Sequence, residues 1–430
     1  MTTIDHIAIR PGDPDYDAAR TTIAGTAEPA VVLRPTDVDE VSAALEYVRA
    51  ADLELAVRSG GHSPLGYSNS DGGAVIDLSR MDSVEVLSDG KVRIGAGATW
   101  GPAAAALAEH GLAITSGDTR SVGVGGLTQA GGMGWMVRKH GLTIDSVLAV
   151  ELVTASGEVV RADAETHPDL FWAVRGGGGN FGIVTAFEIQ AQPVTTLHFG
   201  TMAFALDDVP QLLKSWAATM DSAPEELSTA LSLMPGFGDF PAGAMLWVAY
   251  CGDDLSVLEP LRSLGNLVSD TVSEKRYADV LEEAPHPPEG IRPEIGNTLL
   301  EQLSGDCIEA IAAAYSSGTA GRVVFLRNLG GAMGRVAPDA TAFAHRDAQV
   351  LVVSAKFLPV DAPAEVRAAA RSEWQTIRRH GIGSYAGFLA SDTPEDLAAL
   401  YPPDTLARLV EVKRAWDPDN VFRRNFNIRP

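Results

Sequence analysis

Cysteine and positive charge are both scarce in this 430-residue sequence. The two cysteines, Cys251 and Cys307, are too few and too far apart for a disulfide framework or a metal knuckle, so we predict buried thiols and no metal site. Lys and Arg number 33 against 56 Asp and Glu, which gives a formal net charge of −23. A nucleic-acid partner requires clustered basic residues, and their absence excludes this function class.

Long apolar runs are also missing. No stretch of about 18 consecutive apolar residues occurs, and the N-terminus lacks the apolar core of a signal peptide. We therefore expect a soluble, cytoplasmic protein with no membrane partner. Because 430 residues exceed one ordinary hydrophobic core, we expect two domains, or one large domain with an inserted second.

Helix and strand patterns alternate up to about residue 192. A capping box of Thr36 and Asp39 predicts the start of a helix over 38–48. Ser156-Gly157 predicts the turn of a hairpin. Further strands are predicted at 53–58, 74–78, 91–98, 112–115 and 183–190, and further helices at 100–111 and 167–176.

Beyond about residue 195 the strands become longer and glycine clusters rarer, which indicates a second domain made of a sheet covered by helices. Asp417-Pro418 is expected to end the last helix of the chain. Strands are predicted at 196–206, 244–252, 322–329 and 349–358, and helices at 209–220, 362–381 and 406–416.

Three glycine-rich breaks interrupt the first part: RSGGHS (58–63), SGDTRSVGVGGLTQAGGMG (116–134) and GGGGNFG (176–182). Glycine lets the main chain approach a ligand closely and backbone N–H groups hold phosphate, so three such breaks suit a dinucleotide. A nicotinamide fingerprint is disfavoured, because a polar loop rather than a strand precedes Gly123. Tight turns in a β-rich fold are the structural alternative. A core histidine needs no preceding glycines, so His62 indicates contact with a ligand.

Four blocks then resemble a known family, in its order along the chain. They are RSGGHSPLGYSNSDGGAVIDLSRM, SGDTRSVGVGGLTQAGGMGWMVRKHGLTIDSV, DLFWAVRGGGGNFGIVT and VKRAWDPDNVFRRNFNI. The chain resembles the berberine-bridge-enzyme-like branch of the vanillyl-alcohol-oxidase flavoproteins, and within it the bacterial members. The resemblance is strong over 30–190 and the last 30 or so residues, and loose between them.

The resemblance implies an α+β fold with a PCMH-type FAD-binding domain of two α/β subdomains at 1–194. It also implies a substrate-binding domain of antiparallel sheet covered by helices at 195–395, and a segment at 396–430 that returns to the FAD domain. By the same resemblance, 58–63 is the pyrophosphate loop and His62 is bonded to the flavin 8α-methyl. The FAD-binding residues implied are Arg58, Ser59, Gly60, Gly61, His62, Ser63, Gly66, Tyr67, Ser116, Gly117, Asp118, Thr119, Val122, Gly123, Gly125, Gly126, Gly132, Trp135, Asp145, Gly182, Ile183, Val184, Asn425 and Asn427.

Many members of the family attach FAD a second time through a cysteine, and Thr119 stands at that position here. Covalent attachment through His62 alone is therefore expected. Val122 matches a position beside the flavin where oxygen-using members commonly carry a small side chain. Valine there hints at an oxidase, although packing explains it equally well.

The usual catalytic bases of the family are missing. Ser354 stands where relatives carry Gln or Glu on a strand, and Phe388 replaces the second tyrosine of the segment that begins at Tyr385. Lys356 would share a strand face with Ser354, so Lys356 and Tyr385 are the candidate bases and Ser354 is a third candidate catalytic residue. A solvated lysine and a core tyrosine are the alternatives.

The function implied is an FAD-linked oxidase that removes a hydride from a C–H next to an amine or hydroxyl of a small organic or natural-product substrate. Dioxygen would be the acceptor and hydrogen peroxide the product, in a monomer or homodimer. A flavin dehydrogenase with another acceptor and a flavin-containing binding or resistance protein are the alternatives.

Overall fold

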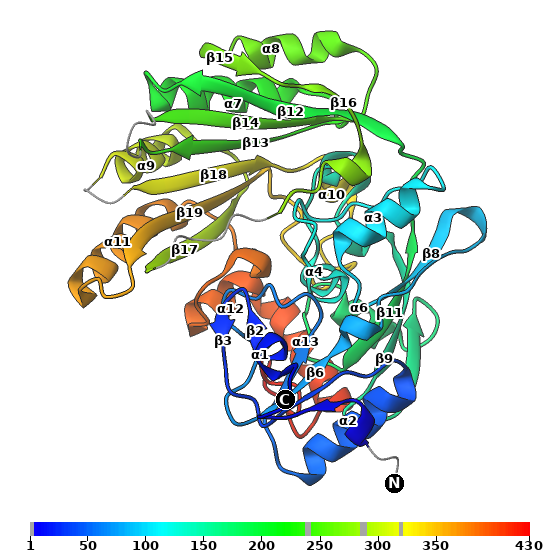
Figure 1. Ribbon diagram of the computed structural model, residues 1–430. Helices are drawn as coiled ribbons and strands as arrows, with labels where there is room; N and C mark the ends of the chain where they lie inside the picture. The colour runs from blue at the N-terminus through cyan, green and yellow to red at the C-terminus, as the bar shows by residue number, and fades with distance from the viewer. Residues whose placement is uncertain (1–3, 237–241, 284–289, 318–320) are drawn as a thin grey trace.

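The computed structural model describes residues 4–236, 242–283, 290–317 and 321–430. Over these residues it contains a four-stranded, a five-stranded and an eight-stranded sheet, and a small hairpin formed by β2 (Thr21–Thr22) and β3 (Gly25–Thr26). The eight-stranded sheet lies above the two smaller ones in Figure 1. In the same part of the chain, no helix has both the length and the apolarity that a bilayer crossing requires.

The four-stranded sheet has its central strands buried on both faces, as parallel strands require. Helix α2 begins at Val38 as predicted, but Asp37 rather than Thr36 caps it, by accepting a hydrogen bond from the Glu40 N–H. Thr36 instead donates to the Glu40 carboxylate. The elements are β1 (Ala8–Ile9), β4 (Val31–Leu33), β6 (Ala74–Asp77) and β5 (Leu55–Arg58), in this order, with α1 (Tyr16–Ala19) and α2 (Val38–Ala50).

The five-stranded sheet is antiparallel throughout. Its β9–β10 hairpin confirms the predicted turn at Ser156-Gly157. The strand predicted at 112–115 is wrong, because Ala113 makes only one bridge, to Gln192. The elements are β10 (Val159–Asp163), β9 (Val147–Val153), β11 (Ile183–Gln190), β8 (Lys91–Gly95) and β7 (Val84–Val86), with α3 (Trp100–Ala108), α4 (Val124–Ala130), α5 (Val137–His140) and α6 (Pro168–Val174).

The eight-stranded sheet is antiparallel, and helices cover one of its faces (Figure 1). Its other face turns toward the two small sheets. The elements are β15 (Asn266–Asp270), β12 (Thr196–Ala205), β14 (Gly243–Tyr250), β13 (Leu227–Met234), β18 (Arg322–Asn328), β19 (Val350–Pro359) and β17 (Ile291–Leu300), with β16 (Ser273–Arg276) paired to β12, and α7 (Val209–Ser222), α8 (Glu259–Arg262), α9 (Gly305–Ser316), α10 (Ala332–Arg335) and α11 (Ala364–Arg378).

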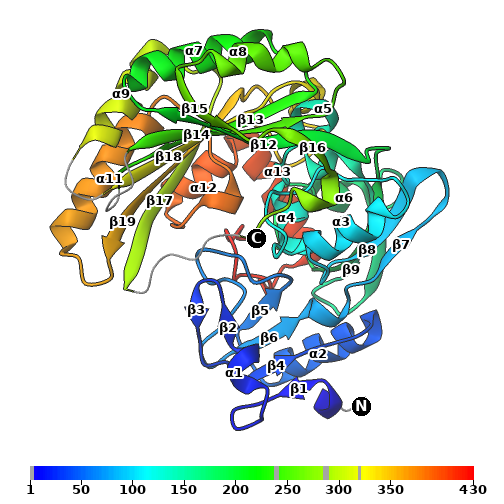
Figure 2. The same ribbon diagram turned by 45° about the horizontal axis from the view of Figure 1, so that its top comes forward.

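The C-terminal part lies beside the small sheets, although it follows the large sheet in sequence (Figure 2). It begins with α12 (Pro394–Leu400) and α13 (Pro403–Trp416), and α13 ends at Asp417 as the sequence predicts. The α+β fold class is thereby confirmed. The domain limits at 194 and 395 stay predictions.

Candidate active site

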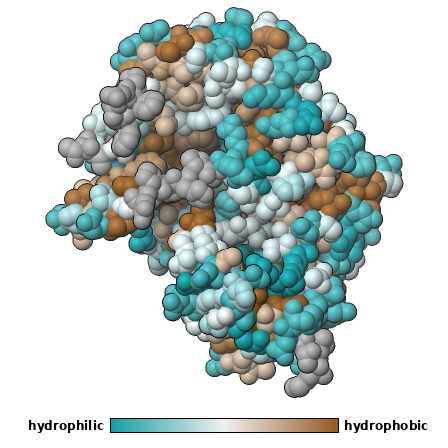
Figure 3. All heavy atoms as spheres, viewed as in Figure 1, coloured by the Kyte–Doolittle hydropathy of each residue, from teal (hydrophilic) through white to brown (hydrophobic). Residues whose placement is uncertain are grey.

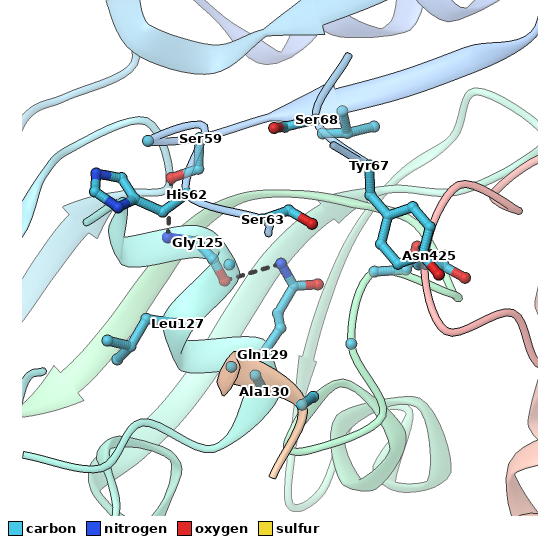
Figure 4. Close-up of a pocket in the computed structure, with 18 of the residues that line it drawn as sticks. Ser59, His62, Ser63, Tyr67, Ser68, Gly125, Leu127, Gln129, Ala130 and Asn425 are labelled. Atoms are coloured by element: carbon cyan, nitrogen blue, oxygen red, sulfur yellow. Dashed lines mark hydrogen bonds between the residues drawn. The ribbon is translucent and has the colours of Figure 1, made fainter. Parts of the chain in front are cut away.

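The glycine-rich breaks converge on one cavity of about 470 Å³. Segments far apart in the sequence form its wall, and Figure 4 shows His62, Tyr67 and Asn425 around it. In the space-filling view the surface is hollowed beneath the large sheet, with hydrophobic residues visible inside the hollow (Figure 3). The sequence could not show that these turns meet, and the structure brings them together.

The first two turns are interlocked through their backbones. A Cβ on Gly60 would lie 2.3 Å from the Gly123 nitrogen, and one on Gly123 would lie 2.2 Å from the Gly60 nitrogen. Ser59 Oγ donates to the Ala96 carbonyl and accepts from the Gly125 N–H (Figure 4). Glycine is required at both positions because the two main chains touch.

Replacing Gly60 by alanine is therefore expected to separate the two turns and to remove most of the bound cofactor. The clash is with backbone atoms, which cannot move aside as a flexible side chain would, and overpacking of this kind costs about 1–3 kcal/mol. The flavin absorbance per purified protein measures the result. Gly305→Ala is the matched control, because its Cβ would meet no atom within 4 Å. Full flavin content in Gly60→Ala would contradict this account.

The cavity wall carries polar atoms that lack partners. Ser68 Oγ, Gln129 Oε1 and Asn425 Oδ1 are buried without a hydrogen bond. No residue that the structure describes accepts from the backbone N–H of Gly60 or Ser63. Buried polar groups are normally satisfied, so the cavity is shaped for a ligand rich in hydrogen-bonding groups.

The third glycine-rich turn is held by the C-terminal segment. Asn180 donates to the Gly177 and Phe426 carbonyls and accepts from the Ile428 N–H. Lys413 of α13 donates to the Asn180 carbonyl. The last residues of the chain therefore form one side of the cavity and keep the turn in place.

Tyr385 contributes a phenol to the wall on the side of the large sheet. The Asn297 side chain of β17 fixes the Tyr385 backbone by accepting from the Tyr385 N–H and donating to the Tyr385 carbonyl. The Tyr385 hydroxyl accepts from the Gly132 N–H. Burial raises the pKa of Tyr385 to about 12. The phenol is thus protonated at neutral pH, where it can donate a hydrogen bond but is a poor proton acceptor.

Comparison with known proteins shows which family this chain belongs to. Residues 29–163 match the family model described as FAD binding domain, and residues 384–429 match the one described as berberine and berberine like. (R)-6-hydroxynicotine oxidase of Paenarthrobacter nicotinovorans is 31% identical, over 98% of this chain and 96% of that protein. Chitooligosaccharide oxidase of Gibberella zeae is 28% identical, over 94% of this chain and 88% of that protein. The crystal structure of 6-hydroxy-D-nicotine oxidase from Arthrobacter nicotinovorans superposes with a TM-score of 0.87 at 30% identity, covering 98% of this chain and 97% of that one.

The chain belongs to the berberine-bridge-enzyme-like FAD-linked oxidoreductases. It is an FAD-dependent oxidoreductase of the PCMH-type fold, as the sequence predicts. The unpartnered polar atoms and the interlocked glycines fit such a cofactor.

Most of the FAD-binding residues expected in this oxidoreductase lie in the cavity wall. Among residues not predicted, Gln129, Asn180 and Arg424 also line it. Gln129 follows Gly125 by one helical turn and donates to its carbonyl, a relation that the spacing would have indicated had α4 been predicted. The expected residues that line the cavity are Ser59, Gly60, Gly61, His62, Ser63, Tyr67, Gly117, Asp118, Thr119, Val122, Gly123, Gly125, Gly126, Gly182, Ile183, Val184 and Asn425.

Seven expected FAD-binding residues lie outside the cavity wall. Arg58 is turned inward, donating to the Ser68 and Ala19 carbonyls, and Ser116 bonds to the hydroxyl of Tyr277. Asp145 pairs with Arg346. These groups support the wall rather than form it. The full set is Arg58, Gly66, Ser116, Gly132, Trp135, Asp145 and Asn427.

Ser354 and Lys356 are not among the residues that line the described cavity, although both are candidate catalytic residues from the sequence. Lys356 Nζ donates to Glu373 of α11 at 2.8 Å. Ser354 Oγ accepts from Arg322, which also pairs with Glu373. The two residues share a strand face as predicted, but that face of β19 packs against the helices. The odd-numbered Val353 instead packs against the hydrophobic cluster that contains Tyr385.

Proposed function

We propose that this oxidoreductase is an oxidase of small organic amines or alcohols that uses dioxygen as its acceptor and forms hydrogen peroxide. The observation that carries the proposal is the single cavity formed by the RSGGHS turn, the turn at Gly123 and the C-terminal segment. FAD, when bound there, supplies the acceptor for a hydride from a substrate C–H and passes the electrons to dioxygen. Two relatives named above as oxidases support this reaction type.

The residues of the three turns would hold FAD through backbone N–H groups. His62 would carry the sole covalent bond, from its imidazole to the flavin. Neither cysteine lines the described cavity wall, and burial raises the pKa of both thiols to about 11, which makes them weak nucleophiles. Thr119 lines the cavity but has no thiol, which supports single attachment.

Tyr385 would donate a hydrogen bond to the substrate or cofactor, with its orientation fixed by Asn297. Phe388 packs edge-on against its ring with a centroid separation of 5.8 Å. The two rings line the cavity and would exclude water from this part of it. The cytoplasmic location and the monomeric or homodimeric state stay predictions.

Reoxidation in air tests the choice of acceptor. The holoenzyme would be reduced anaerobically by light and mixed with air-saturated buffer, and flavin absorbance and hydrogen peroxide would be followed together. We expect rapid recovery of the oxidised spectrum with about one peroxide per flavin, as two-electron transfer requires. Slow recovery would favour the dehydrogenase alternative. A panel of amines and alcohols that never bleaches the flavin would favour the binding-protein alternative.

A further inference from the structure

One carboxylate in the cavity wall has no role in the function proposed above. Asp118 is the sole Asp or Glu among the described residues that line the cavity. Its Oδ2 accepts a hydrogen bond from Arg327 Nη2 at 2.6 Å, and no described residue bonds to its Oδ1. The resemblance to the flavoprotein family implies that Asp118 contacts the cofactor, because Asp118 lies in the second glycine-rich turn.

The two ends of this ion pair differ in access. The Arg327 side chain is 2% exposed, whereas the Asp118 side chain is 31% exposed. Rings cover the guanidinium, whose carbon lies 4.7 Å from the Trp135 centroid and 5.5 Å from that of Phe325. Arg327 Nη1 is also occupied, by the carbonyl of Met133. A ligand therefore meets the carboxylate first, with the guanidinium behind it.

The surroundings favour a cation at this place. Asp118 and Tyr385 both line the cavity, and Arg327 lies behind Asp118. Arg424 is the one Lys or Arg in the described wall, and it is paired with Glu54. The protein as a whole carries a net charge of −23, which attracts cations to its surface.

We propose that Asp118 binds the nitrogen of an amine substrate and that Arg327 positions the Asp118 carboxylate. This inference rests on the proposed function and narrows the substrate class of the oxidase to amines. When the C–H next to a neutral amine loses its hydride to the cofactor, the nitrogen lone pair forms a C=N bond and the nitrogen becomes positive. A carboxylate already held at that nitrogen stabilises the developing charge without reorganising. A sugar or simple alcohol leaves no such lasting cation.

Calorimetric titration of the oxidised, anaerobic holoenzyme tests the proposal with three probes of similar shape and different charge: benzylamine, benzyl alcohol and benzoate. We expect benzylamine to bind about tenfold more tightly than benzyl alcohol, a difference of about 1.4 kcal/mol, and benzoate to bind least. Asp118→Asn should remove this preference and leave benzyl alcohol affinity unchanged. Glu373→Gln is the matched control. It removes the carboxylate that pairs with Arg322, which lies on β18 like Arg327 but on the opposite face of the sheet.

Equal binding of amine and alcohol by the unmodified holoenzyme, tighter binding of benzoate, or an unchanged preference in Asp118→Asn would each overturn the proposal. Because Asp118→Asn leaves a buried guanidinium unpaired, the double variant Asp118→Asn/Arg327→Gln removes both charges and should lose the preference as well. The titration excludes oxygen, and an unbleached flavin absorbance recorded alongside shows that the heat comes from binding and not from hydride transfer, so the test can fail while the oxidase reaction stands. The oxygen experiment can likewise fail while the amine preference stands.

Discussion

Replacing His62 by alanine is expected to release the flavin from the acid-denatured protein. His62 follows Gly60 and Gly61 in a turn that lines the cavity, and neither cysteine lines the described wall. Figure 4 shows the His62 ring beside Gly125. The unmodified protein should give a yellow acid precipitate and an intact mass increased by one FAD. His62→Ala should give a colourless precipitate with the flavin in the supernatant, a loss of essentially all covalent cofactor.

The native His62→Ala protein should still bind some FAD, because the contact between Gly60 and Gly123 and the backbone N–H groups of the turns remain. Its flavin should have a lower reduction potential, since an attached imidazole withdraws electron density from the ring system. His110→Ala is the control, as His110 is exposed at the end of α3 and is not among the residues that line the cavity. Flavin that stays with denatured His62→Ala would place the bond on another residue, and a colourless precipitate from the unmodified protein would refute covalent attachment.

The turns that surround the cavity could be predicted from the sequence because clustered glycines mark places where the main chain must turn or approach another group closely. Gly60 and Gly123 stand where two main chains touch, and no other residue fits. Glycines also prevented the prediction of helix α4. Gly125 and Gly126 weaken its helical pattern, yet Gly125 is needed because a Cβ there would lie 2.9 Å from the Ala96 carbonyl oxygen. A contact distant in sequence thus overrides the helix propensity.

The large sheet was harder to predict, because tertiary packing decides its pattern. Strand β17 contains Pro293 and Gly296, which break a strand signal, and it was not predicted. The proline is tolerated because β17 is an edge strand, and Gly296 is required because a Cβ would lie 2.4 Å from the indole nitrogen of Trp374. The sequence likewise could not predict which way the Lys356 side chain points, because only the position of α11 shows which face of β19 is covered by helices.

The C-terminal segment contains a buried ion pair on which the cavity depends. Lys413 and Asp417 lie one helical turn apart, 2.6 Å between Nζ and Oδ2, and both side chains are fully buried. Lys413 also donates to the carbonyls of Asn180 and Phe422, while Asp417 accepts from the Phe422 N–H. This network joins α13, the third glycine-rich turn and the final residues of the chain.

Lys413→Met is expected to cost about 3–5 kcal/mol, because it leaves a fully buried carboxylate without its cation. Asn180 and Phe422, which this network holds, line the cavity, so the flavin should become exposed to solvent at a lower temperature than in the unmodified protein. Thermal unfolding followed by flavin fluorescence measures both effects. Arg276→Met is the control, because its pair with Asp279 lies at the surface and its loss should leave the midpoint unchanged. An unchanged midpoint in Lys413→Met would mean that the C-terminal segment is held by apolar packing alone, since the buried pair would then contribute nothing that methionine cannot replace.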